Sequence, residues 1–143
     1  MSDLPSRAVE TSLRVRYSET DQMGIVYHAN YVVWFEIGRT EWCRAAGLPY
    51  RSIEDAGLLI LVTAVQAKYR RSARYDDAIL VRTRMTELSP RGCAFGYEIL
   101  DTEGRVLAEG GTRHVFADSS GRPRRAPEGI VGPLGRFRGA GRP

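Results

Sequence analysis

The chain has 143 residues, enough for one domain with a single hydrophobic core. No run of about 18 apolar residues occurs, so the sequence predicts no membrane-spanning helix and no membrane insertion. The polar N-terminus lacks the apolar stretch of a secretion signal, and the two cysteines lack metal-ligand spacing. We therefore expect a cytoplasmic protein in which Cys43 and Cys93 are structural thiols, with no metal site.

The net charge of +4 is unevenly distributed along the chain. Residues 119–143 carry a net charge of +5, whereas the preceding 118 residues carry −1. The Gly/Pro/Arg-rich composition of residues 119–143 predicts a flexible tail with too few apolar side chains for a further core element. Aromatic residues are almost absent from it, so we expect no nucleic-acid partner. The predicted organisation is a folded domain over residues 1–118 and a flexible tail over residues 119–143.

The first predicted element is a strand over residues 9–17, in which apolar and polar side chains alternate. The side chains expected on its buried face are Val9, Leu13, Val15 and Tyr17. A turn-rich connection follows over residues 18–29. It contains two acids, Glu19 and Asp21, of which Glu19 is expected to be a solvated loop residue.

A long helix is predicted from about Asn30 to Ala46. Asn30 is a suitable N-cap, Gly47 suits the position just after the last turn, and Pro49 stops the helix. The strongly polar side chains lie on one narrow arc, which predicts that the rest of the fold wraps around the helix. These polar residues are Glu36, Arg39, Thr40, Glu41 and Arg44.

After a loop over residues 50–57, strand patterns dominate. The predicted strands cover residues 58–70, 78–88, 93–101 and 105–117. Tight turn signals at residues 89–92 and 102–105 make the last three strands antiparallel neighbours. The simplest packing is an α+β fold, in which a five-stranded antiparallel sheet is wrapped around one long central helix.

The connection before the helix carries the main chemical signal. Asp21 lies a few residues before a helix N-terminus, where unpaired N–H groups can bind a developing anion. A carboxylate at such a place suits acyl transfer, although Asp21 could equally be an N-cap or a loop-stabilising residue. Gly24 is best explained by a tight turn or by close passage of a substrate, because a Cβ would block either.

Two motifs together resemble the hotdog-fold acyl-CoA thioesterases. They are Asp-x-x-Gly-x-Val-Tyr-His at residues 21–28 and Asn-Tyr-x-x-Trp-Phe-Glu-x-x-Arg-Thr-Glu-Trp at residues 30–42. More narrowly, the chain is similar to the 4-hydroxybenzoyl-CoA thioesterase-like group and its Tol–Pal-operon branch. The resemblance covers roughly residues 9–118, and residues 69–77 also match, with Ala73 where the family usually has proline. It implies a hotdog fold and hydrolysis of an acyl-CoA, with no cofactor other than the coenzyme A of the substrate.

The resemblance also implies roles for individual residues. Asp21 is the expected catalytic carboxylate, either as a nucleophile that forms a mixed anhydride or as the base that activates water. His28 is expected to line the acyl site, and Tyr17 to hydrogen-bond around it, although packing at the strand end explains Tyr17 almost as well. The other residues expected at the substrate are Gly24, Val26, Tyr27, Asn30 and Tyr31.

Basic side chains near the strand ends are candidates for the phosphates of coenzyme A: Lys68, Arg70, Arg71, Arg74 and Arg91. His114 lies in the last strand pattern and is expected to be structural. Because an exposed sheet edge favours pairing with a second copy, we expect a homodimer or a homotetramer made of two dimers, with active sites at the dimer interface. Two alternatives stay open. One is a hotdog hydratase or dehydratase, and the other is a binding protein that acts through the basic tail.

Overall fold

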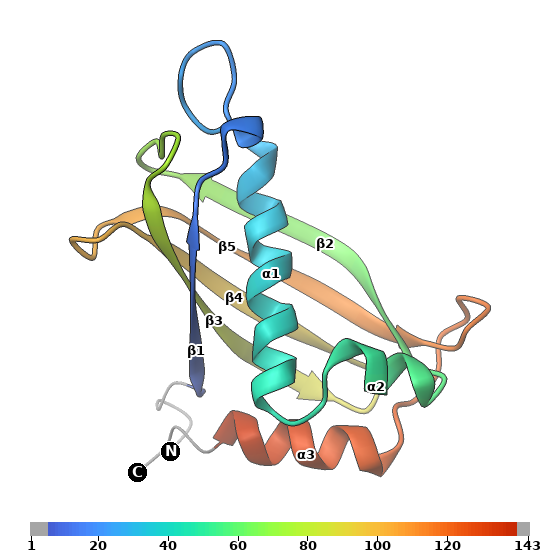
Figure 1. Ribbon diagram of the computed structural model, residues 1–143. Coiled ribbons are helices and arrows are strands. Elements are labelled where there is room, and N and C mark those ends of the chain that lie inside the picture. Colours follow the sequence, from blue (N-terminus) through green and yellow to red (C-terminus); the bar gives the residue numbers. More distant parts are fainter. Residues whose placement is uncertain (1–5, 140–143) are drawn as a thin grey trace.

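The structure, a computed structural model, describes residues 6–139, in which one long helix packs against a five-stranded antiparallel sheet (Figure 1). The strands are β1 (Ala8–Arg14), β2 (Leu59–Tyr69), β3 (Ala78–Ser89), β4 (Gly92–Leu100) and β5 (Val106–Ala117). The helices are α1 (Ala29–Ala45), α2 (Tyr50–Asp55) and α3 (Glu128–Gly139). The predicted α+β class, with one sheet around a central helix, is confirmed.

The strands follow the order β1-β3-β4-β5-β2 across the sheet. The two predicted hairpins, β3–β4 and β4–β5, are both present and antiparallel. Strand β2 pairs with β5 from Leu59 opposite Ala117 to Tyr69 opposite Ala108, with a bulge after Val62. Its other edge has no partner strand among residues 6–139. The sheet therefore offers the main-chain groups of β2 for further pairing.

The core lies between α1 and the sheet. Trp34, Phe35 and Trp42 on α1 are completely buried, and the Phe35 ring stacks on Tyr97 of β4 with centroids 4.4 Å apart. Gly38 lies where the helix approaches β3, and a Cβ there would overlap the side chains of that strand. A glycine at this position thus lets the helix come close to the sheet.

Arg39 was predicted on the polar arc of the helix, and that prediction is wrong because the side chain is only 8% exposed. Its Nε donates to the hydroxyl of Tyr50 over 3.1 Å, and Nη1 lies 3.5 Å from the hydroxyl of Tyr97. The two tyrosine hydroxyls thus accept hydrogen bonds from the buried guanidinium. Both tyrosines lie too far from Arg39 in the sequence for a helical pattern to reveal these contacts.

The ends of the first elements differ from the prediction. Strand β1 ends at Arg14, and Tyr17 lies in a short 3-10 turn with 77% of its surface exposed, so it does not continue the buried face. His28, rather than Asn30, is the N-cap of α1, because the helix begins at Ala29. The Asn30 side chain donates to the Glu19 carbonyl over 2.9 Å instead of capping the helix. Gly47 has a φ of +86° just after the helix, as its predicted position requires.

Residues 50–57 were predicted as a loop, but residues 50–55 form the short helix α2. Ile53 on this helix is 1% exposed and packs in the core. A single buried side chain in a six-residue helix creates no recognisable period, so no sequence pattern predicts this helix.

The prediction that residues 119–143 add nothing to the core is wrong for the described part of that segment. Helix α3 buries Ile130 and Leu134, and Phe137 meets the Trp42 ring edge-on with centroids 5.0 Å apart. These three side chains recur at i, i+4 and i+7, but the glycines and prolines between them hide the helical period. Residues 1–5 and 140–143, which complete the two predicted segments, lie outside the described residues.

Some arginines of this segment also form hydrogen bonds with the rest of the domain. Arg138 donates to the carbonyls of Met85 and Thr86 on β3 over 2.8 and 2.7 Å. Arg124 donates to the Gly57 carbonyl over 2.9 Å. These side chains therefore stabilise the position of α3, in addition to giving the segment its positive charge.

Both cysteines are free and buried. Burial raises the pKa of the Cys43 and Cys93 thiols to about 12, so both stay protonated at neutral pH, as structural thiols should. None of the helices within residues 6–139 has the length and apolar character needed to cross a membrane.

Candidate active site

Residues 20–26, which we call the Asp21 turn, form a small hairpin directly before α1. The Asp21 N–H donates to the Ile25 carbonyl over 2.9 Å, and the Gly24 N–H donates to the Asp21 carbonyl over 3.0 Å. An isolated bridge between Thr20 and Val26 closes the hairpin. Gly24 has a φ of +80°, a conformation that residues with a Cβ rarely adopt. The backbone requirement predicted for Gly24 is thus confirmed.

The Asp21 carboxylate is only partly engaged. Its Oδ1 accepts a hydrogen bond from the Met23 N–H over 2.8 Å, which fixes the orientation of the side chain. Within residues 6–139 no side chain forms an ion pair with Asp21, and Oδ2 accepts no hydrogen bond. One carboxylate oxygen is therefore held in place while the other is free to attack an electrophile or to take a proton.

The start of α1 adds a second element of the site. The N–H groups of Tyr27 and Asn30 donate to the carbonyls of Glu19 and Tyr27, but those of His28 and Ala29 find no acceptor within residues 6–139. Unpaired amides at a helix N-terminus, together with the helix dipole, stabilise a developing oxyanion. The site thus combines a free carboxylate oxygen with two free backbone donors.

Two tyrosine rings lie beside the exposed side chain of His28. The Tyr27 ring lies 4.6 Å from the imidazole, and the Tyr69 ring meets it edge-on at 6.1 Å. The Tyr69 hydroxyl donates to the His28 carbonyl over 3.2 Å. Tyr69 therefore ties the end of β2 to the first turn of α1, a contact that sequence reasoning missed.

Glu19 is not the solvated acid that the sequence predicted, because it is only 4% exposed. Its Oε2 accepts a hydrogen bond from Nε1 of Trp34 over 3.0 Å, and Oε1 accepts from the Arg16 N–H over 2.8 Å. Burial raises the pKa of the Glu19 carboxyl, but these hydrogen bonds and the charge of Arg16 together bring it below its ordinary value. Glu19 is therefore a buried, ionised carboxylate.

The connection between β2 and β3, residues 70–77, is bonded to the site through Ala73. The Ala73 carbonyl accepts from the Val26 N–H over 2.9 Å, and the Ala73 N–H donates to the Tyr31 hydroxyl over 3.0 Å. Nη1 of Arg74 lies 3.4 Å from the Gly24 carbonyl. This connection therefore holds both the Asp21 turn and the first turn of α1.

Replacing Ala73 by proline tests this link. Proline has no N–H, so the buried hydroxyl of Tyr31 would lose its donor, and we expect a loss of about 1–3 kcal/mol in the free energy of unfolding. Urea denaturation followed by fluorescence measures this loss. In a Tyr31→Phe background the same substitution should cost clearly less, and an equal cost in both backgrounds would contradict the role of this hydrogen bond.

The structure brings most of the predicted site residues together at this end of α1. The Asp21 turn and the helix start contain Asp21, Gly24, Val26, Tyr27, His28, Asn30 and Tyr31. Val26 and Tyr31 are each only 3% exposed, so they pack beneath the surface of the site and not at its opening. Tyr17 forms no hydrogen bond to Asp21, and its exposed ring lies against Tyr75 with centroids 5.6 Å apart.

The five basic candidates for the coenzyme A phosphates do not form one cluster. Arg74 reaches the Asp21 turn, whereas Arg91 lies at the opposite end of the sheet, where its carbonyl accepts from the Phe116 N–H. Arg70 is ion-paired with Glu109, and Arg71 lines a hollow of about 320 Å³ beside the β4–β5 hairpin.

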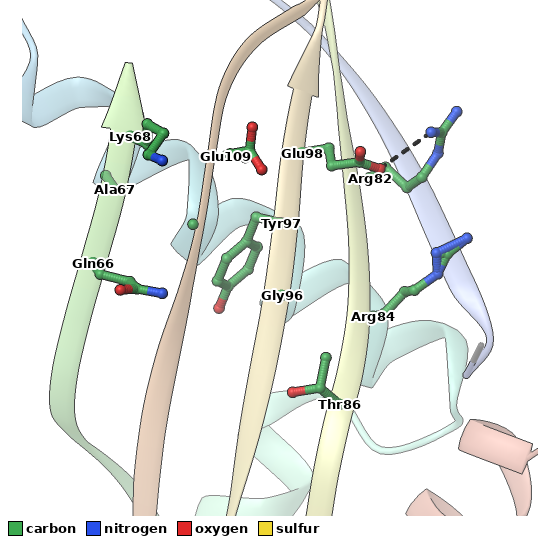
Figure 2. A pocket seen from close by; sticks show the side chains of 11 residues that line it. Gln66, Ala67, Lys68, Arg82, Arg84, Thr86, Gly96, Tyr97, Glu98 and Glu109 are labelled. Carbon is green, nitrogen blue, oxygen red and sulfur yellow. Dashed lines mark hydrogen bonds and ion pairs between the residues drawn. The ribbon is translucent and has the colours of Figure 1, made fainter. Parts of the chain in front are cut away.

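Lys68 points to the outer face of the sheet, away from α1 (Figure 2). There it lines a hollow of about 630 Å³ that crosses the strands, together with Glu109, Glu98 and Arg84. This hollow lies on the face of the sheet opposite to α1, so it is separate from the Asp21 turn.

His114 is buried in β5, with Nε2 2.8 Å from the Thr112 hydroxyl. Its Nδ1 has no partner within residues 6–139. Burial, with the nearby charge of Arg39, lowers the pKa of His114 to about 4. The placement agrees with a structural role, and residues 6–139 bring no three potential metal ligands together.

The lowered pKa of His114 predicts a pH dependence of stability. Between about pH 6.5, the ordinary pKa, and pH 4 the unfolded chain binds a proton that the folded one does not, so stability falls as the pH drops through this window. The full effect is roughly 3 kcal/mol. Urea denaturation measures how much the free energy of unfolding falls between pH 7 and pH 4.5. This fall should be clearly smaller for His114→Gln than for the unchanged protein. Equal losses in the two proteins would contradict the prediction.

An antiparallel sheet around one helix, with a partly free carboxylate in the turn that leads into that helix, is the arrangement of the hotdog-fold proteins that process thioesters. A family model described as "Thioesterase-like superfamily" matches residues 15–134, and the chain belongs to that superfamily.

Individual relatives agree with this assignment. The chain is 31% identical over 120 residues to the acyl-CoA thioester hydrolase YbgC of Escherichia coli O6:H1, covering 83% of this chain and 90% of the relative. A hypothetical protein of Thermus thermophilus, TT1821, superposes with a TM-score of 0.86 at 40% identity, covering 92% of this chain and 98% of that one. A DHNA-CoA thioesterase of Staphylococcus aureus gives 0.79 at 30% identity, covering 82% and 80%.

Proposed function

We propose that this protein is an acyl-CoA thioesterase that hydrolyses its substrate to a free acid and coenzyme A. The observation that carries the proposal is the half-free carboxylate of Asp21 in the turn that leads into α1, together with the unpaired amides of His28 and Ala29 at the start of that helix. Thioester hydrolysis needs both parts, a group that attacks or activates water and donors for the oxyanion that develops on the carbonyl. The names of the relatives support the same reaction.

Two routes use this arrangement. In the first, Oδ2 of Asp21 attacks the acyl carbon, the C–S bond breaks, coenzyme A leaves as a thiol after protonation, and water hydrolyses the mixed anhydride. In the second, Asp21 takes a proton from water while the water oxygen attacks the acyl carbon, the C–S bond breaks, and coenzyme A leaves as a thiol after it takes up a proton. In both, the amides of His28 and Ala29 donate to the carbonyl oxygen, and the exposed ring of His28 lines the acyl group.

Release of free thiol from a panel of acyl-CoA thioesters tests the proposal. The panel contains short-chain, long-chain and benzoyl thioesters, because the proposal leaves the acyl group open. Hydration of an enoyl-CoA is measured in parallel. Thiol release without hydration supports the thioesterase, whereas hydration without thiol release supports the hydratase alternative and contradicts the proposal.

We propose further that the protein belongs to the Tol–Pal-operon branch of this family and works in the cytoplasm. The motif at residues 17–42 supports the branch. The position of the gene, inside or outside a Tol–Pal operon, tests the branch assignment.

For the phosphates of coenzyme A we propose Arg74 as the first contact. It is the basic candidate whose guanidinium reaches the Asp21 turn. Arg71, in the same connection between β2 and β3, is the second candidate. If the proposal holds, Arg74→Gln raises KM for acyl-CoA with little effect on kcat, and Arg91→Gln, at the far end of the sheet, serves as the matched control.

The free edge of β2 supports the proposed homodimer. Leu61, Val62 and Val65 on this strand are 36–46% exposed, and Val33 of α1 is 42% exposed. Apolar side chains on an unpaired edge strand favour pairing with a second copy of the chain. Two-fold pairing would bring the end of β2 that carries Leu59 in one subunit near the end that carries Tyr69 in the other. The active site would then lie at the interface, and two such dimers would form the tetramer.

The proposed dimer predicts the effect of a charge on this edge. Val65→Arg places a cation on the edge strand, so light scattering at micromolar concentration should show a monomer for the variant and a dimer or tetramer for the unchanged protein. Thr102→Arg, in the exposed β4–β5 turn, should leave the oligomer intact. A fully active, well-folded monomer of the unchanged protein would exclude the proposal.

A further inference from the structure

Glu19 is a buried acid for which neither route of hydrolysis provides a step. It lies two residues before Asp21, but its side chain is 4% exposed and points into the fold. An ionised carboxylate is costly to bury, so its hydrogen bonds must compensate for the lost hydration. Those hydrogen bonds reveal what the residue does.

The carboxylate of Glu19 is held by two elements. Trp34, fully buried on α1, donates from its indole nitrogen to Oε2 over 3.0 Å. The backbone N–H of Arg16 donates to Oε1 over 2.8 Å, and the Arg16 guanidinium lies 3.4 Å from Oε2. The side chain therefore fixes the chain just before the Asp21 turn against the first turns of α1.

The backbone carbonyl of Glu19 makes a second pair of contacts. It accepts from the Tyr27 N–H over 2.8 Å and from Nδ2 of Asn30 over 2.9 Å. The Asp21 turn begins and ends at this point, because residues 20–26 lie between Glu19 and Tyr27. One residue thus holds both ends of the hairpin that carries Asp21.

We propose that Glu19 is a positioning residue, which sets the place of the Asp21 carboxylate relative to the free amides of His28 and Ala29 through its bonds to Trp34, Tyr27 and Asn30. The inference rests on the proposed thioesterase function. In both routes the free Oδ2 of Asp21 must act on the carbonyl group that the two amides hold, either directly or through the attacking water, and a displacement of about 1 Å costs on the order of 100-fold in rate.

Glutamine at position 19 separates this role from simple packing. A carboxylate accepts from the Trp34 and Arg16 donors on different oxygens, whereas glutamine has one acceptor oxygen and one NH₂ group. In Glu19→Gln, therefore, one N–H donor must face another donor. Trp34→Phe removes the indole N–H, so in the double variant the glutamine oxygen can accept from Arg16 without this conflict.

The experiment measures kcat, KM and the melting temperature for Glu19→Gln, Trp34→Phe and the double variant. We expect Glu19→Gln to lower kcat by roughly 10–100-fold with little change in KM, because the hairpin is displaced while substrate binding is kept. Trp34→Phe should lower kcat by a smaller factor, and the double variant should lower kcat by no more than Glu19→Gln alone does. Glu41→Gln, an acid on α1 paired with Arg44 away from the site, is the matched control and should keep full activity.

Two further readouts separate positioning from the alternatives. The fall of kcat/KM at low pH, the acid limb of its pH profile, should persist in Glu19→Gln, because the catalytic carboxylate of Asp21 is unchanged in this variant. By hydrogen exchange, the protection of the Asp21 and Met23 amides, which are bonded within the turn, should fall by about tenfold, while the amides of β5 keep theirs.

Three results would overturn the inference. They are a lowered melting temperature with unchanged kcat, additive losses in the double variant, and loss of the acid limb in Glu19→Gln, which would make Glu19 the acid itself. If the unchanged protein released no thiol from any thioester, the proposed function would fail. Hydrogen exchange would then decide the positioning role alone, and unchanged protection of Asp21 and Met23 would reject it.

Discussion

Replacing Asp21 by asparagine is expected to lower kcat by about 10²–10⁴-fold, the range found when a group that transfers a proton or attacks the substrate is removed. Asparagine keeps the size of the side chain, and its Oδ1 can still accept from the Met23 N–H, so the Asp21 turn should stay folded. It loses the negative charge that both routes of hydrolysis need. KM should change little, because the interaction matters mainly in the transition state.

Steady-state release of thiol, with the melting temperature as a check on folding, measures the effect of Asp21→Asn. If Asp21→Asn kept more than about a tenth of the kcat of the unchanged protein while Glu19→Gln were inactive, the catalytic acid would be Glu19 and not Asp21. If both variants kept their activity, the proposed mechanism would have to be abandoned. A Glu19→Gln variant of intermediate activity that keeps its acid limb agrees with both proposals.

Truncation of the chain after Asp118 is expected to destabilise the protein severely. A flexible tail could be removed without harm, but helix α3 buries Ile130 and Leu134 and covers Trp42 through Phe137. The truncated chain would expose this part of the core to water. We therefore expect it to aggregate, or to unfold at a much lower temperature than the full chain.

A single substitution tests the same surface without removing the helix. Leu134 is fully buried, so Leu134→Ala should lower the free energy of unfolding by about 2–5 kcal/mol, which urea denaturation measures. Arg136→Ala, an exposed residue of the same helix, should change it by less than about 0.5 kcal/mol. If the truncated protein had full stability and activity, residues 119–143 would be a dispensable tail after all. The alternative in which this tail binds a partner would then be open again.

Local signals were sufficient to predict the sheet and the central helix. Alternating side chains and short turn residues identify β3, β4 and β5, because in a hairpin neighbours in the sequence are neighbours in the sheet. The period of α1 and Gly47 likewise define that helix within one residue at each end. These features depend on residues a few positions apart, which a sequence displays directly.

The parts that escaped prediction depend on distant contacts. Glu19 looks like a loop acid until Trp34, fifteen residues later, supplies the N–H that makes its burial tolerable. The hydroxyls that satisfy Arg39 come from Tyr50 and Tyr97, on α2 and β4. A pattern of single residues cannot show which donors and acceptors the fold brings together.

The sequence predicts the position of the proposed catalytic motif and the use of backbone amides at the start of the helix, but it does not show which amides are left free. Position and resemblance pointed to Asp21, whereas the unpaired amides of His28 and Ala29 are backbone groups that any residue carries. Only the path of the chain decides which amides are left without an acceptor. The role of Ala73, whose N–H and carbonyl are both used, is hidden for the same reason.

The contact between the two ends of the described chain has a practical consequence for engineering. The Arg7 N–H donates to the Arg138 carbonyl over 2.9 Å, and the Arg7 carbonyl accepts from Nε1 of Trp42 near the end of α1. Helix α3, which carries Arg138, likewise lies at the end of α1 that is far from the Asp21 turn (Figure 1). With 17 residues, α1 separates the two regions by about 25 Å. A fusion partner or a surface tether attached at either end would therefore leave the mouth of the site open. A short linker could also join the ends in a circular permutant, with new termini cut into the exposed turn at residues 102–104.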